Sequence, residues 1–80
     1  MRVEIQLFAV LKEELGDKVT LDLPEPVTVD TLKEGFAAQY PQFRSAMPSL
    51  SVAVDQAYSS GSEPILAGQE VALFPPVSGG

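Results

Sequence analysis

The last six residues of the chain hold its clearest candidate for chemistry. They read Pro75-Pro76-Val77-Ser78-Gly79-Gly80. Because two adjacent prolines cannot extend a sheet ladder, this segment is predicted to leave the folded domain in a stiff, extended form. At roughly 3.3 Å per residue, it would reach about 20 Å from the domain. Its two final glycines have no Cβ, which allows bare backbone to pass through a channel too narrow for side chains.

The reactive group at the far end of this segment would be the carboxylate of Gly80. A carboxylate does not react with nucleophiles until its oxygen becomes a leaving group, and adenylation by ATP in a separate enzyme is the usual cellular route. The acyl adenylate then reacts with a sulfur donor to give a thiocarboxylate, or with a cysteine or amine to give a thioester or an amide. We therefore interpret the segment as a carried substrate. A terminal stub without function is the alternative.

The rest of the chain lacks the usual catalytic side chains. It contains no cysteine and no histidine, which excludes a disulfide, a thiolate nucleophile, a zinc site of thiolates or imidazoles, and Ser-His or Cys-His relays. The acidic residues Glu13, Glu14 and Asp17 sit at a predicted helix end without converging ligands, so a solvated face is expected there. A domain of 80 residues has no room for a walled catalytic cavity beside its core. Any chemistry of the chain must therefore use carboxylates, hydroxyls, lysines or the chain ends, and no metal site is predicted.

The charge of the chain restricts its partners. Eleven acidic and five basic residues give a formal net charge of −6. Because phosphates repel such a surface, nucleic acid and anionic membranes are not expected partners. A basic groove on another protein is the natural complement. No apolar run is long enough for a signal peptide or a bilayer span, so a cytoplasmic location is expected.

The hydrophobic pattern predicts four strands and two helices. Alternating apolar residues indicate strands over residues 3–7, 18–23, 50–54 and 70–74. Helix formers in residues 9–15 predict a short helix that ends at Gly16. A longer helix is predicted between a cap at Thr28 or Asp30 and a stop at Pro41. Its apolar residues follow three- and four-residue spacing and form one stripe for a sheet to bury: Val29, Leu32, Phe36 and Tyr40.

The order of these elements indicates the fold class. Residues 42–49 are interpreted as loop, 59–62 as flexible linker and 64–68 as a turn. Two strands, one main amphipathic helix and two further strands fit a two-layer α+β domain in which a mixed sheet wraps around one helix. This is the arrangement of the ubiquitin-like, or β-grasp, fold, although other small α+β folds share the order. We expect a β-grasp domain over residues 1–74 and an extended flexible tail over residues 75–80.

Two large aromatic residues fall on the polar side of their strands. If the odd-numbered residues of the first strand face the helix, Phe8 shares the register of Gln6 and points away. In the last strand, Phe74 shares its parity with Glu70 and Ala72. Should the two strands be neighbours, as in β-grasp domains, the rings form one exposed apolar patch of the kind that marks a protein contact. The alternative is that a bulge turns them into a satellite of the core.

With these features, the sequence resembles the family of small, sulfur-carrying subunits of molybdopterin synthase. These are β-grasp relatives of ubiquitin and of the thiamin-pathway sulfur carrier. The similarity covers essentially the whole chain and is most specific in residues 70–80, EVALFPPVSGG. Residues 52–56, VAVDQ, match the family's central strand, although an asparagine is commoner at the position of Asp55. Support near the start comes from Phe8-Ala9, Leu11-Lys12-Glu13 and Gly16.

The resemblance implies a sulfur carrier that is a non-catalytic synthase subunit. An E1-like enzyme would adenylate Gly80 with ATP and magnesium, and a sulfur donor protein would convert it to a thiocarboxylate. The chain itself would bind no cofactor. The loaded carrier would dock on the large catalytic subunit, thread residues 75–79 into its active site and donate sulfur to cyclic pyranopterin monophosphate. A heterotetramer of two large and two small subunits is the implied assembly.

The resemblance also implies a docking surface. By position in the family pattern, Phe8, Tyr58 and Phe74 would form an apolar surface for the partner. The cations Lys12 and Arg44 could pair with that partner, although a solvated position is the commoner role of such residues.

Other functions fit the same residues. A protein modifier would use the diglycine to form an isopeptide bond with lysine. A plain binding module would need no terminal group, so it would keep its function without Gly80. A thiamin-pathway carrier is less favoured, because the run Phe74-Pro75-Pro76-Val77-Ser78 is similar to the molybdopterin type. Tungsten cofactor assembly stays open.

Overall fold

The computed structural model describes residues 1–75 of the chain. The predicted tail therefore lies almost entirely outside the described residues, from Pro76 through Val77 and Ser78 to Gly79 and Gly80. Pro75 is described and directly follows the last strand.

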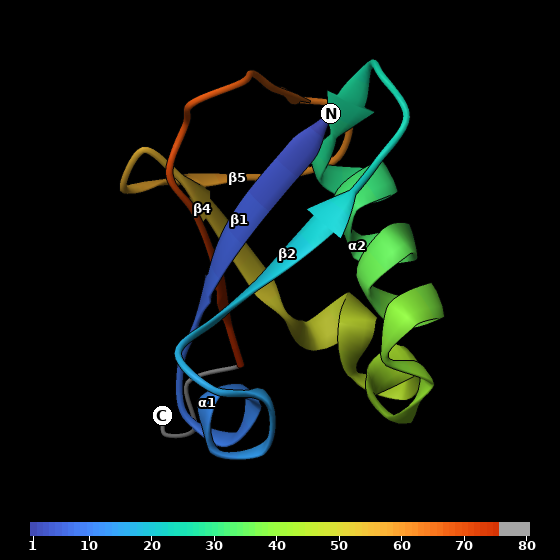
Figure 1. Ribbon diagram of the computed structural model, residues 1–80, viewed down its shortest axis with the longest axis vertical. Helices are drawn as coiled ribbons and strands as arrows, with labels where there is room; N and C mark the ends of the chain where they lie inside the picture. The colour runs from blue at the N-terminus through green and yellow to red at the C-terminus, as the bar shows by residue number, and fades with distance from the viewer. Residues whose placement is uncertain (76–80) are drawn as a thin grey trace.

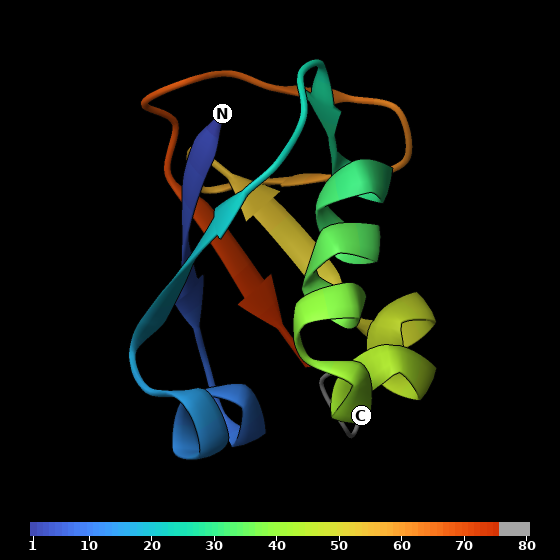
Figure 2. The ribbon, with the colours of Figure 1, turned by 45° about the vertical axis from the view of Figure 1, so that its right-hand side comes forward.

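A mixed sheet forms one layer of the described part of the chain (Figure 1). Its five strands are β1 (Arg2–Leu7), β2 (Lys18–Asp22), β4 (Ser51–Val54), β5 (Ala57–Ser59) and β7 (Val71–Phe74). They have the order β2-β1-β7-β4-β5. Only β1 and β7 pair in parallel in this sheet, and Figure 2 shows β7, in red, between β1 and β4. The first and last strands are thus neighbours. Two shorter strands, β3 (Val27–Thr28) and β6 (Pro64–Ile65), pair separately.

The main helix, α2 (Val29–Gln39), packs on one face of this sheet (Figure 2). Of the two caps that the sequence predicted, Thr28 is the one used and Asp30 lies in the first turn: the backbone N–H of Thr31 donates to Oγ1 of Thr28 over 3.2 Å. In return, the backbone N–H of Thr28 donates to Oγ1 of Thr31 over 2.7 Å. These two bonds satisfy donors that the first turn of a helix leaves without partners. The helix ends before Pro41, whose ring is incompatible with a continuing helix.

The cap leads to a first prediction. The change Thr28→Ala removes the oxygen that accepts the Thr31 N–H bond, so we expect the free energy of unfolding to fall by about 1 kcal/mol. Thr28→Ser keeps a hydroxyl at the same position, so its free energy of unfolding should fall much less. Urea denaturation of the three proteins measures the difference. Equal losses for both variants would contradict the capping role.

The core lies between α2 and the sheet and draws on both layers. Its largest fully buried side chains are Phe36, Ile5, Leu7, Leu11, Leu32 and Leu73. Gly35 allows α2 to approach the end of β2 closely, because a Cβ at this position would collide with Cδ2 of Leu23. A mixed sheet wrapped around one helix is the β-grasp fold, so the predicted fold class is confirmed.

Several local predictions were wrong. The segment predicted as loop forms a 3₁₀ helix, η1 (Pro41–Ser49), which buries Phe43 and Met47 against the core. The predicted turn over residues 64–68 begins with β6, and β5, which ends at the first residue of the predicted linker, was not predicted. Such short strands show too few residues for a period of two to be visible in the sequence. The other strand ends differ from the predictions by one residue.

The short helix α1 (Val10–Leu15) agrees with the prediction in its end point. Gly16 follows it with a φ of 98°, and its N–H donates to the carbonyl of Lys12 over 2.9 Å. A positive φ favours glycine because it has no Cβ. The predicted start at Ala9 is one residue early, since Ala9 is the residue before the helix.

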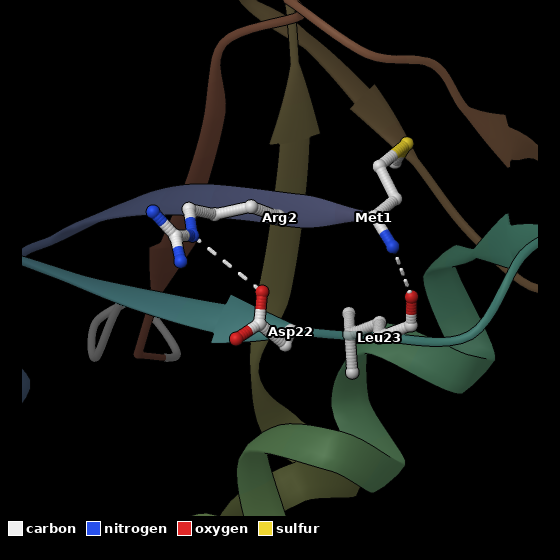
Figure 3. Close-up of polar contacts among 4 residues, drawn as sticks. All are labelled: Met1, Arg2, Asp22 and Leu23. Carbon is white, nitrogen blue, oxygen red and sulfur yellow. Dashed lines mark hydrogen bonds and ion pairs between the residues drawn. The ribbon is translucent and has the colours of Figure 1, made fainter.

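Polar contacts join β1 to the edge strand β2 (Figure 3). The amino group of Met1 donates to the carbonyl of Leu23 over 2.6 Å, and Nε of Arg2 lies 3.5 Å from Oδ1 of Asp22. Arg2 and Asp22 are directly opposite each other in the ladder. The β2 side of the sheet therefore carries charge on the face that α2 does not cover.

Within residues 1–75, the structure contains no helix of the length and hydropathy that spanning a bilayer requires.

Candidate functional site: an aromatic surface on the open face of the sheet

The face of the sheet opposite α2 presents Phe8 and Phe74. In β7, Val71 and Leu73 are buried against the helix, and alternation sends Ala72 and Phe74 to the open face. The parallel register pairs Leu7 of β1 with Leu73 of β7, so Phe8 follows β1 at the level where Phe74 ends β7. The two rings are stacked with centroids 4.7 Å apart and an interplanar angle of 13°. Neither ring belongs to the buried core cluster, so they are not a satellite of it.

Tyr58 lies next to this pair. It comes from β5, whose pairing places Tyr58 directly opposite Ala53 of β4. Its ring lies edge-on to that of Phe74 with centroids 6.2 Å apart, and 74% of the residue is exposed. We call Phe8, Tyr58 and Phe74 the aromatic surface. The structure therefore brings together the three residues that the family pattern grouped, although they are far apart in the sequence.

A groove of about 310 Å³ lies beside the three rings. Its floor is made of the small residues Ala53 and Ala72, which are directly opposite each other on β4 and β7. Ala53 is only 8% exposed, yet it is not part of the core cluster around α2. The strand predicted over residues 50–54 turns Leu50, Val52 and Val54 toward the core, so its alternation would leave Ala53 on the polar side, and the burial of Ala53 was missed. The signal was an alanine between two core valines, where a polar residue would be usual.

The sequence of β7 connects the aromatic surface to the tail. Pro75 follows Phe74 directly, so the segment with the two terminal glycines is attached beside the aromatic surface. Among residues 1–75, no group of three or more Cys, His, Asp or Glu side chains is placed to hold a metal. Exposed aromatic rings around a small-residue floor provide apolar contact area with fixed geometry, which suits the binding of another protein.

The other candidate residues lie apart from the aromatic surface or are already paired. Nζ of Lys12 lies 3.4 Å from Oδ1 of Asp17, so both residues form a surface ion pair within the chain. Arg44 belongs to η1, which packs against α2. Glu13 and Glu14 are exposed on α1, as expected for a solvated face.

Asp55 fixes the hairpin that carries Tyr58. It occupies the turn between β4 and β5 with a φ of 50°, a conformation that aspartate and asparagine tolerate better than most residues. Its carboxylate accepts hydrogen bonds from the backbone N–H of Glu70 over 3.0 Å and from Nε2 of Gln69 over 2.9 Å. The N–H of Asp55 donates to the carbonyl of Glu70 over 2.8 Å. The turn is thereby attached to the residues just before β7.

A second prediction concerns this turn. Asp55→Ala removes the acceptor of two hydrogen bonds and places a residue with a Cβ but no polar group at a positive φ. We expect the free energy of unfolding to fall by about 1 kcal/mol. Asp55→Asn keeps one acceptor oxygen, and asparagine tolerates the same positive φ, so the free energy of unfolding should fall less than for alanine. Thermal melting by circular dichroism compares the variants. A loss for asparagine as large as for alanine would show that the turn does not depend on these bonds.

Comparison with known proteins gives consistent results. The ThiS family matches residues 5–80. The molybdopterin synthase sulfur carrier subunit of Escherichia coli (strain K12) is 35% identical over 80 residues, which cover 98% of this chain and 99% of that protein. The subunit of the same name from Dictyostelium discoideum is 38% identical over 81 residues, covering 96% and 94%. The crystal structure of SAMP1, a small archaeal modifier protein from Haloferax volcanii, has a TM-score of 0.82 at 30% identity and covers both chains fully.

Proposed function

Because the chain belongs to the ThiS family, we propose that it carries sulfur in molybdenum cofactor biosynthesis, as the non-catalytic small subunit of a molybdopterin synthase. Two relatives at 35% and 38% identity bear the name of that sulfur carrier subunit. Both alignments cover nearly the full length of each protein. The structural observation that carries the proposal is the aromatic surface, which ends at Phe74, directly before the tail.

The chemistry of the carrier would take place at Gly80. Its carboxylate attacks the α-phosphate of ATP on an E1-like enzyme that uses magnesium, and pyrophosphate leaves. The terminal sulfur of a persulfide on a sulfur donor protein then attacks the acyl carbon, and AMP leaves. A thiol reduces the resulting acyl disulfide, so that a thiocarboxylate remains and the donor's sulfur leaves in a new disulfide. In the large subunit, this sulfur attacks cyclic pyranopterin monophosphate, and the carrier returns as the carboxylate when water takes the place of sulfur. Two rounds supply the two sulfurs of the dithiolene.

The described domain would act in this sequence by docking. The aromatic surface binds the large catalytic subunit, and residues 75–79 pass from Phe74 into its active site. The stacked rings of Phe8 and Phe74 preserve the shape of the surface before binding, so little conformational entropy is lost on association. The basic groups that bind the pterin phosphate belong to the large subunit, since this chain has a net charge of −6.

Intact mass spectrometry tests the proposal. The purified chain is incubated with an E1-like enzyme, ATP, magnesium and a sulfide source. We expect a mass increase equal to the replacement of one oxygen by sulfur, and this product should support molybdopterin formation with the large subunit. A chain that never gains this mass under conditions that load the Escherichia coli relative would contradict the proposal.

A protein modifier is the second candidate function. It is favoured by the structural similarity to SAMP1, whose name describes it as a modifier protein. A modifier would form an amide between Gly80 and a lysine amine, so the chain would appear in cell lysate attached to larger proteins. Immunoblotting of an affinity-tagged chain distinguishes the two functions: bands of higher mass that resist thiols and disappear without Gly80 would indicate conjugation.

A further inference from the structure

The groove beside the aromatic surface has an acidic residue at one end. Glu70 lies on the same face as Ala72 and Phe74, and at about 3.3 Å per residue it sits about 13 Å along the strand from Phe74. It lines the groove together with the amide side chains of Gln6 and Gln56. The groove therefore changes along its length, from aromatic rings, over an alanine floor with Gln6 directly beside Ala72, to Glu70 and Gln56.

The carboxylate of Glu70 has no cationic partner among residues 1–75. The cations on the same face of the sheet are paired elsewhere: Arg2 with Asp22 at 3.5 Å and Lys18 with Glu4 at 3.6 Å (Figure 3 shows the first pair). No hydrogen bond within the described part of the chain uses the side chain of Glu70 either.

A second carboxylate strengthens the negative potential at this end of the groove. Oδ1 of Asp55 accepts the backbone N–H of Glu70 over 3.0 Å, so the two acidic residues are close neighbours. Arg2 and Lys18 line a neighbouring pocket with Glu70, but each is paired with another carboxylate, and the net charge of the whole chain is −6. A positively charged group of a partner would gain most from this end of the groove.

We propose that the groove accepts an arginine side chain of the protein that docks on the aromatic surface, with its guanidinium bound to Glu70. This inference rests on the docking role proposed above. The aliphatic part of the side chain lies over Ala53 and Ala72, between the rings and the acidic end. The guanidinium donates to the carboxylate of Glu70 and to the amide oxygens of Gln6 and Gln56.

Arginine fits this groove better than lysine. A guanidinium is planar and offers five donors in a fixed arrangement, which can serve one carboxylate and two amide oxygens together. Its flat surface can also stack on an aromatic ring such as that of Tyr58. The ammonium group of lysine is more strongly hydrated, and it would complement the charge of Glu70 but not the arrangement of the three acceptors.

The test is the affinity of the full chain for the large subunit of molybdopterin synthase from the same organism, measured by calorimetry at low and high NaCl. Glu70→Gln removes the charge and keeps the size of the side chain. We expect it to raise Kd about tenfold at low salt and to reduce the salt dependence of Kd. Glu70→Lys should raise Kd further. The matched control is Glu34→Gln, which makes the same charge change on α2, on the other side of the sheet, and should leave Kd within about twofold of the unchanged chain.

The outcomes separate this inference from the proposed docking role. If Glu70→Gln binds as well as Glu34→Gln, or loses affinity without any change in salt dependence, the arginine site is wrong. If Phe74→Ala weakens binding in the same experiment, the docking role nevertheless stands. Equal melting temperatures for all variants exclude unfolding as the cause of a loss, since the Glu70 side chain makes no ion pair or hydrogen bond within residues 1–75.

Discussion

Deletion of Gly80 is expected to abolish both the sulfur-loaded form of the chain and molybdopterin formation. In the proposed function, the activating enzyme would position the carboxylate of the last residue at the α-phosphate of ATP. Shortening the segment by one residue withdraws the carboxylate by about 3.3 Å, a distance that removes the alignment needed for attack. Intact mass after incubation with the activating enzyme, ATP and sulfide measures loading, and single-turnover assays with the large subunit measure transfer.

The matched control for this deletion is Ser78→Ala, which alters the same segment but keeps its length and its terminal group. It should be loaded with sulfur to a similar extent. The melting temperatures of both variants should equal that of the unchanged chain, because residues 78 and 80 follow β7 and the last named core residue, Leu73, in the sequence. A chain without Gly80 that still supports molybdopterin formation would rule out the carrier function and favour a plain binding module.

Replacement of Phe74 by alanine is expected to weaken binding of the large subunit by about 1–2 kcal/mol or more, which is roughly five- to thirtyfold in Kd. Phe74 is the central ring of the aromatic surface, since it stacks on Phe8 and also contacts the edge of Tyr58. Phe74 is half-buried in the free chain, and its loss removes one anchor of the interface and leaves the other two rings without their common neighbour. Calorimetric titration of the large subunit measures the change.

Leu66→Ala provides the control for Phe74→Ala. Leu66 is also a large exposed apolar residue, at 62% exposure, but it does not line the groove beside the aromatic surface. Its replacement should leave Kd nearly unchanged. Equal affinities of the Phe74 and Leu66 variants would show that the large subunit binds elsewhere on the carrier. Loss of sulfur transfer by Phe74→Ala at low but not at saturating concentrations of large subunit would confirm that the defect is in docking.

Sequence patterns were most informative where the alternation of apolar and polar side chains continues along a whole strand, or where a helix begins at a capping residue. The alternation in β1 and β7 predicted that Phe8 and Phe74 leave the core side of the sheet, and the cap at Thr28 predicted the start of α2. Local patterns failed where the element is short or irregular. The 3₁₀ helix η1 is stabilised by packing against α2, and the three-residue strand β5 by pairing with β4, so neither has a sequence period of its own.

The roles of Ala53 and Asp55 in the candidate site could not be predicted from local sequence patterns either. Ala53 is buried because Tyr58 and Ala72 are its neighbours on the two adjacent strands. The role of Asp55 depends on Gln69 and Glu70, which follow it by 14 and 15 positions. Neither relationship can be derived from one segment of the sequence.

The sequence alone determined the face of the sheet on which Phe8 and Phe74 lie, because side chain direction alternates along a strand whatever its neighbours are. It also determined that the chain has no thiol or imidazole for catalysis. Only the tertiary structure decided that Phe8, Tyr58 and Phe74 meet, since this requires β1, β7, β4 and β5 to be adjacent and in register. That adjacency results from the burial of one continuous core against α2, to which residues from the whole chain contribute together.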